Sequence, residues 1–412
     1  MSLLHAVENT SFYYNRFLLI TLFAAASCLV SGKLQADDHL LEQDKIPLWK
    51  LSYQDNFGEK LTFEGKKVAQ TNEGVILLQK PDRTYVRVDG DNVVQLQETD
   101  KTFSYLSAEE FEKQVRENFT EDLGDFGGRR FERTEHYLII SGNYSTDQDK
   151  RFGIFIEQVY DQFYAHWKRF GVELEKPPLP LVIILDPTYE FTDNWLPDER
   201  VMPVASAGLK GNFDGLYLLS MNRAIVDSEL SLDKNDAADV VKQAYIQLCY
   251  SSGLFQPYAD IPDWVAKGSA WCFGAPDYQH SFGWSRPGSN HYLKLYPKLS
   301  QHTPTSLTEL VSSDSRFQVT PWNQINTPDP LTTMGEEMQR EAHAFYESSL
   351  LIAYLFKHKR SEVGKYMQRV SQLKPLQKYE EQQRRADFEA AFGDDWKRLD
   401  QQLKNYGHRL KR

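Results

Sequence analysis

Two neighbouring helices predicted from the sequence carry the residues whose spacing is closest to a catalytic pattern. The stretch "DVVKQAYIQL", Asp239 to Leu248, is apolar on one side. On a helix, Lys242 and Ile246 lie on one face because they are four residues apart. Two His residues at this spacing converge on one zinc ion, and a Glu directly after the first His acts as general base. This chain has Lys242, Gln243 and Ile246 at those three positions.

These residue types cannot perform zinc chemistry. Isoleucine has no donor atom, glutamine cannot take a proton from water at neutral pH, and a lysine is ordinarily a cation that repels a metal ion. The pattern therefore predicts no metal site and no catalytic residue, and zinc is not expected as a cofactor.

The surrounding sequence resembles a known family. The segment from Asp239 to Asp277 is similar to the peptidase-MA-like, gluzincin-like domain of unknown function of secreted bacterial proteins. The family's His-Glu-x-x-His motif maps onto residues 242–246, and the Glu that is its third ligand falls on Lys267. The resemblance spans about residues 131–410 and implies an α+β fold. The leading β-region, residues 45–105, resembles the small SH3-like modules that precede such domains.

All three ligand positions and the base position of this resemblance are replaced, which would remove the Lewis acid and the activated water. The sequence therefore predicts an exported pseudopeptidase that acts as a binding or structural protein of the periplasm or cell surface. The alternative is an active hydrolase with a rearranged metal site or a metal-independent mechanism. His343 and Glu347, four residues apart on a predicted helix, are the candidate pair for such a displaced site, although a pair of this kind is ordinarily a surface ion pair.

The two lysines leave three interpretations open. Each stem could cover apolar surface while its ammonium reaches solvent or a carboxylate. Alternatively, Lys242 and Lys267 could bind an anionic group, such as a peptide carboxylate or an acidic sugar. A nucleophilic lysine of lowered pKa is the third. The possible cleft-lining residues are Tyr245, Trp264, Tyr346 and Glu347.

Composition limits the partners. The 412 residues carry a net charge of −11 and no sustained Lys/Arg block, so we expect no nucleic-acid binding. The expected partner is a peptide, a protein or an anionic ligand.

The N-terminus predicts export. Arg16 precedes an uncharged run, Phe17 to Gly32, and a small residue, Ala36, stands before a polar segment, so residues 1–36 are expected to be a signal peptide. Lipid attachment at Cys28 and an uncleaved anchor are the alternatives, and only through them would the chain contact a membrane. Cys249 and Cys272 would remain in the mature chain, either as a disulfide or as buried thiols.

Periodicity predicts how the chain is organised. Short β-like runs over residues 45–105 predict a small β-barrel or roll, and residues 106–130 a helix and a linker. Ser107 and Glu110 have capping-box spacing. The rest predicts an α+β domain over residues 131–410: strands at 136–142, 177–187 and 215–226 and a helix at 148–170, followed by a helical half. The helices of that half are expected at 236–252, 262–273, 289–300, 306–313, 336–358, 361–372 and 376–408.

Overall fold

The computed structural model describes residues 46–55, 57–121, 130–142, 146–185, 216–226, 234–274, 306–318 and 330–410. All the described helices and strands belong to one compact unit that begins at Pro47. The predicted signal peptide with Cys28, most of the predicted linker and the helix predicted at 289–300 lie outside the described residues. Among the described helices, none has the length and apolar character needed to cross a membrane.

The first sheet is built from the short β-like runs of the sequence. Its five strands pair antiparallel in the order β4-β3-β2-β1-β5, and its small core is formed by Leu51, Ile76, Leu78 and Val88. Two of the runs join into one long strand, β2. The strands are β1 (Pro47–Gln54), β2 (Lys60–Gln70), β3 (Ile76–Gln79), β4 (Tyr85–Val88) and β5 (Val93–Thr102).

Helix α2 (Ala108–Glu121) begins where the capping box predicts. The Ser107 hydroxyl accepts a hydrogen bond from the Glu110 amide at 3.2 Å, and the Glu110 carboxylate accepts one from the Ser107 amide at 3.0 Å. The reciprocal bonds satisfy two backbone donors that the first turn of a helix leaves without partners.

The second sheet is mixed, with strand order β6-β7-β8-β10-β9. Its three central strands, β7, β8 and β10, run parallel, while β6 and β9 pair antiparallel at the edges. Helix α3 (Thr146–Arg169) connects β7 to β8. The strands are β6 (Arg130–Arg133), β7 (Tyr137–Ser141), β8 (Leu181–Leu185), β9 (Leu216–Leu218) and β10 (Arg223–Val226).

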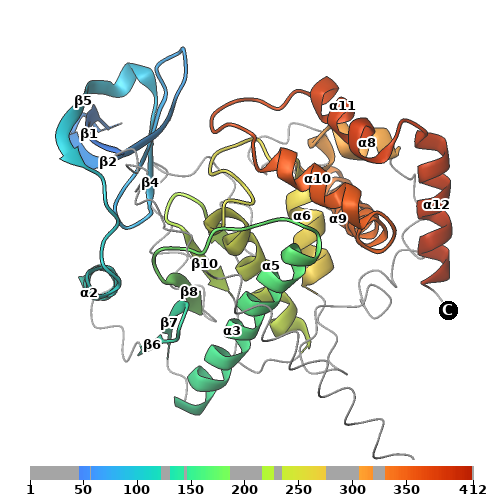
Figure 1. Ribbon diagram of the computed structural model, residues 1–412, viewed down its shortest axis with the longest axis horizontal. Helices are drawn as coiled ribbons and strands as arrows, with labels where there is room; N and C mark the ends of the chain where they lie inside the picture. The colour runs from blue at the N-terminus through green and yellow to red at the C-terminus, as the bar shows by residue number, and fades with distance from the viewer. Residues whose placement is uncertain are drawn as a thin grey trace, which may run out of the picture. The chain divides into compact units, whose positions relative to one another are not determined.

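Both faces of this sheet are buried, as continuous apolar strands require. Alternate residues such as Ile139 and Ile183 face the main core with α3 and α5, whereas Leu138 and Val182 face α2. Helices α3 and α5 lie together on one side of the sheet (Figure 1). The helix of segment 106–130 thus contributes to the core of the second sheet.

The rest of the described chain is helical, so the protein is of the α+β class. The elements are α5 (Lys234–Ser251), α6 (Asp263–Phe273), α8 (Leu307–Ser312), η4 (Ser315–Phe317), α9 (Pro330–His358), α10 (Arg360–Val370), α11 (Glu381–Phe392) and α12 (Trp396–Arg409).

The single helix predicted over residues 376–408 is wrong. The chain breaks at Gly393, whose φ of +94° lies in a region that favours glycine. Asp395 then caps a new helix, because its carboxylate accepts a hydrogen bond from the Arg398 amide at 3.0 Å.

Candidate functional site

Helices α5, α6 and α9 bring the predicted site residues together. The close contact of α6 with α9 depends on Gly268, because a Cβ added there would lie 2.8 Å from Cβ of Ser348. Gly274, directly after α6, passes over α5 in the same way, since its Cβ would lie 2.4 Å from Cγ of Lys242. The backbone at the two glycines therefore lies directly against side chains of the neighbouring helices, close to the positions that the sequence singled out.

Lys242 is buried, with 4% of its surface exposed. Its Nζ lies 2.6 Å from Oδ1 of Asp239, one turn earlier on α5, and 4.7 Å from the centre of the Trp271 ring on α6. A buried ammonium is tolerated only when its charge is compensated. A carboxylate and an aromatic face supply that compensation here.

Lys267 is more open, with 33% of its side chain exposed. Its Nζ lies 3.2 Å from Oδ2 of Asp263, one turn earlier on α6, and donates to the carbonyl of Phe317 at 3.5 Å. Burial raises the pKa of Asp263 to about 6, although the nearby Lys267 ammonium opposes this shift. Each lysine thus has a carboxylate on its own helix, with the acid N-terminal to the base, which is the favoured order.

A stacked aromatic pair connects the two lysine positions. The rings of Trp271 on α6 and Phe345 on α9 stack at 5.1 Å with an angle of 21° between their planes. Lys242 contacts Trp271, and Nζ of Lys267 lies 5.6 Å from the Phe345 ring. The contacts therefore run from one ammonium to the other through two rings.

Three of the other predicted positions on α5 and α6, those of Tyr245, Ile246 and Trp264, are packing positions. Gln243 is half-buried, and Ile246 packs against the main core. Tyr245 (0% exposed) lies between the rings of Phe163 and Phe273, and Trp264 (1% exposed) packs on α10 and α11. Both aromatic residues are core side chains.

Helix α9 contributes Tyr346 and Glu347, both half-buried. The Tyr346 ring meets Trp271 edge-on at 5.8 Å. Burial raises the pKa of Tyr346, and the positive charge of Lys242 counteracts this rise. His343 is also half-buried, one turn before Glu347.

These residues do not fit a zinc ion. Of the three positions at which the resemblance implies metal ligands, two hold lysines that pair with carboxylates of their own helices, and the third, Ile246, offers only carbon. Across the described ranges, no group of three or more His, Cys, Asp or Glu side chains has the geometry to hold a metal ion.

Cys249 and Cys272, within the described part of the chain, are buried thiols rather than the halves of a disulfide. Burial raises the pKa of Cys272 to about 12 and that of Cys249 well above its usual value. Both are therefore poor nucleophiles at neutral pH, because the thiolate is the reactive form.

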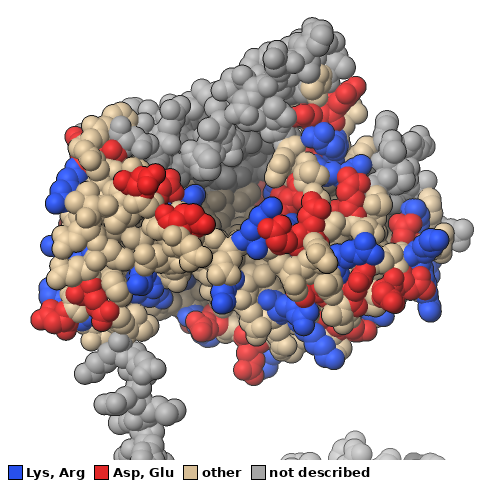
Figure 2. Space-filling model, turned by 90° about the horizontal axis from the view of Figure 1, so that it is seen from above, with Lys and Arg blue, Asp and Glu red and all other residues tan. Residues whose placement is uncertain are grey.

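The charges on the face seen in Figure 2 are interspersed. Lys and Arg side chains stand next to Asp and Glu over the described part of this face. The described part of this face therefore has no large area of a single sign.

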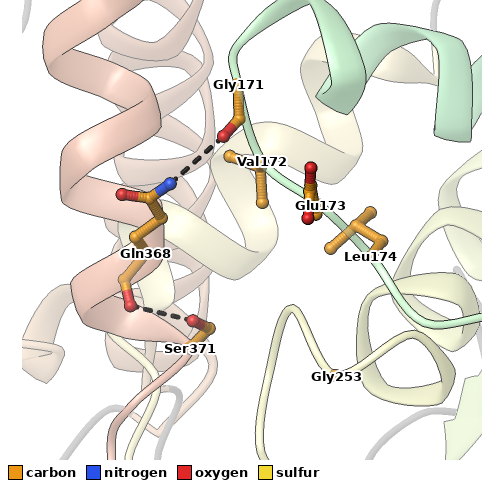
Figure 3. A pocket seen from close by; sticks show the side chains of 7 residues that line it. All are labelled: Gly171, Val172, Glu173, Leu174, Gly253, Gln368 and Ser371. Carbon is orange, nitrogen blue, oxygen red and sulfur yellow. Dashed lines mark hydrogen bonds between the residues drawn. The ribbon is translucent and has the colours of Figure 1, made fainter. Parts of the chain in front are cut away.

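A cavity of about 410 Å³ lies elsewhere, between the end of α3, the loop after α5 and the end of α10 (Figure 3). The Gln368 amide donates across it to the Gly171 carbonyl at 3.1 Å. None of the predicted site residues lines it; its lining residues are Gly171, Val172, Glu173, Leu174, Gly253, Gln368 and Ser371.

Sequence reasoning missed four residues of this site. Asp239 and Asp263 precede the two lysines by three and four residues, a helical spacing that could have identified them. The stacking of Trp271 on Phe345 had no local signal, because the two residues lie on different helices and are far apart in the sequence.

Comparison with known proteins supports a domain over the helical half. Residues 236–377 match the model of a family described as a protein of unknown function, DUF1570. The match covers α5, α6, α8, α9 and α10, and therefore the whole lysine site. No curated protein matches the chain.

Proposed function

We propose that the protein is an exported pseudopeptidase, a non-catalytic relative of gluzincin-like zinc peptidases. In this proposal it binds a peptide, a protein or an anionic ligand, or has a structural role, in the periplasm or at the cell surface. One observation carries the proposal: two of the three presumed ligand positions hold lysines, whose charges are compensated by Asp239 and Asp263. A chain that had lost only one ligand would retain part of a metal site. In this chain, the ammonium groups of Lys242 and Lys267 occupy two of the positions instead, each paired with an aspartate.

The architecture that the proposal assumes is a peptidase-MA-like domain preceded by an SH3-like module. The α+β class and the family match over residues 236–377 are compatible with this architecture. Export rests on the sequence of residues 1–36 alone.

A peptidase assay tests the proposal. The mature protein, incubated with zinc and a mixture of unstructured peptides, should cleave none of them above the rate of a heat-inactivated sample. Zinc-dependent cleavage that a chelator abolishes would overturn the proposal. His343→Ala and Glu347→Gln variants would then show whether the activity comes from a displaced site on α9, because either substitution should remove it.

A further inference from the structure

The ammonium of Lys242 lies where three helices meet. Asp239 belongs to α5 and Trp271 to α6, and both contact the same Nζ. From α9, Tyr346 meets the Trp271 ring edge-on at 5.8 Å. The backbone at Gly274 closes over the lysine stem, because only a residue without a side chain fits against its Cγ. Only 4% of the Lys242 surface is exposed, so the side chain lies in an enclosed space, which we call the recess.

The chemistry of this recess is that of a cation site. A carboxylate oxygen at 2.6 Å gives a close ion pair, and the face of a Trp ring at 4.7 Å attracts a cation through its quadrupole. Carboxylate and aromatic face together are the groups with which proteins recognise organic ammonium ions. In this chain the ammonium comes from the protein itself.

We propose that Lys242 is a built-in ligand: its side chain fills an ammonium recess between α5, α6 and α9 and keeps it closed to external molecules. The recess takes a primary alkylammonium ion when the lysine side chain is shortened. The inference rests on the proposed function in one respect: it takes the recess to be the place where the presumed peptidase relatives hold their metal ion. It implies that ligands of the natural protein bind elsewhere than at Lys242.

Lys267 provides the matched control. It also pairs with an aspartate one turn earlier and lies near aromatic rings, but a third of its side chain contacts solvent. Shortening Lys267 therefore leaves an open surface that water fills, and no enclosed recess for an alkylammonium ion.

The test is chemical rescue in the full mature chain. Lys242→Ala removes three carbons and the amine, which correspond to n-propylammonium. We expect this variant to melt about 4–7 °C below the natural protein, because the buried ion pair with Asp239 is lost. Adding n-propylammonium chloride should restore the melting temperature with a saturable dependence on concentration. Equal ionic strength of sodium chloride, or equal concentrations of 1-propanol, should not.

The controls separate rescue from a general salt effect. The natural protein and Lys267→Ala should show no saturable shift with n-propylammonium. The inference is overturned if Lys242→Ala shows none either, or if 1-propanol restores it equally well.

A second variant covers the case in which Lys242→Ala does not fold. Lys242→Met keeps most of the side-chain volume and removes the charge, so it should melt several degrees below the natural protein and should not respond to n-propylammonium. A melting temperature equal to that of the natural protein would overturn the inference. None of these melting measurements depends on peptidase activity or zinc content. The peptidase assay can therefore refute the proposed function while the rescue experiment tests the recess by itself.

Discussion

Lowering the pH should reduce the stability of the folded protein through one side chain, the imidazole of His166. His166 on α3 is enclosed by Phe170, Phe273 and Phe356, whose ring centres lie 4.6–4.9 Å from its own, and its Nε2 is inaccessible to solvent. Burial lowers the pKa of His166 to about 3, and the charges of Arg169 and Arg360 act in the same direction. The ring is therefore neutral in the folded protein throughout the physiological pH range.

The sign of the pH effect follows from proton binding in the two states. Below pH 6.5 the unfolded chain takes up a proton on this imidazole, while the folded chain binds none until about pH 3. The stability that the neutral His166 contributes is thus complete above pH 6.5, and it is lost progressively as the pH falls from 6.5 towards 3. At pH 5 the loss is about 1–2 kcal/mol, which allows for the part of the residue that contacts solvent.

The assay compares the melting temperature at pH 7 and pH 5 in the natural protein and in His166→Phe, which keeps an aromatic ring in the same enclosure. The comparison is needed because Asp263, whose pKa is raised to about 6, stabilises the fold as the pH falls and so partly cancels the effect. We expect the variant to lose about 1–3 °C less than the natural protein on acidification. His408→Phe, at an exposed position of α12, should behave like the natural protein. An identical loss in the natural protein and His166→Phe would refute the reasoning.

Two further predictions concern the helix contacts that support the site. Gly268→Ala should lower the free energy of unfolding by about 1–3 kcal/mol, because its Cβ would force α6 away from α9. As a control, Gly335→Ala on α9, where a Cβ meets nothing within 4 Å, should not lower the free energy of unfolding in the same denaturation experiment. Arg384→Met should cost about 3–5 kcal/mol, because the buried guanidinium pairs with Asp314 at 2.5 Å and Asp260 at 3.0 Å, and Asp314 also accepts from the first amide of α6. The neighbouring exposed Arg385→Met should change stability by less than about 1 kcal/mol in urea unfolding, and equal effects at the two positions would contradict the prediction.

Local signals in the sequence predicted much of the fold. The Ser107–Glu110 capping box and the apolar run of β8 each specify their element through short-range physics, a pair of hydrogen bonds in one case and two buried faces in the other. The break at Gly393 also had a local signal, a glycine followed by an aspartate cap, which the amphipathic pattern on either side obscured.

The environment of the candidate site could not be predicted in the same way. Trp264 was expected to line a cleft, yet it lies in the core, because a short helix that is apolar on most sides gives no indication of which face meets solvent. The Trp271–Phe345 stack depends on how α9 crosses α6, which is a property of the tertiary structure. Residue type singled out Lys242 and Lys267, and only the packing showed that Trp271 and Phe345 lie beside them.

The most direct test of the central claim is the zinc content of the natural mature protein, measured by elemental mass spectrometry beside the quadruple variant Lys242→His, Gln243→Glu, Ile246→His, Lys267→Glu. The account predicts a metal-free natural protein and about one zinc per chain in the variant, as a single site of this motif would bind. Stoichiometric zinc in the natural protein would contradict it and place a metal site elsewhere in the chain.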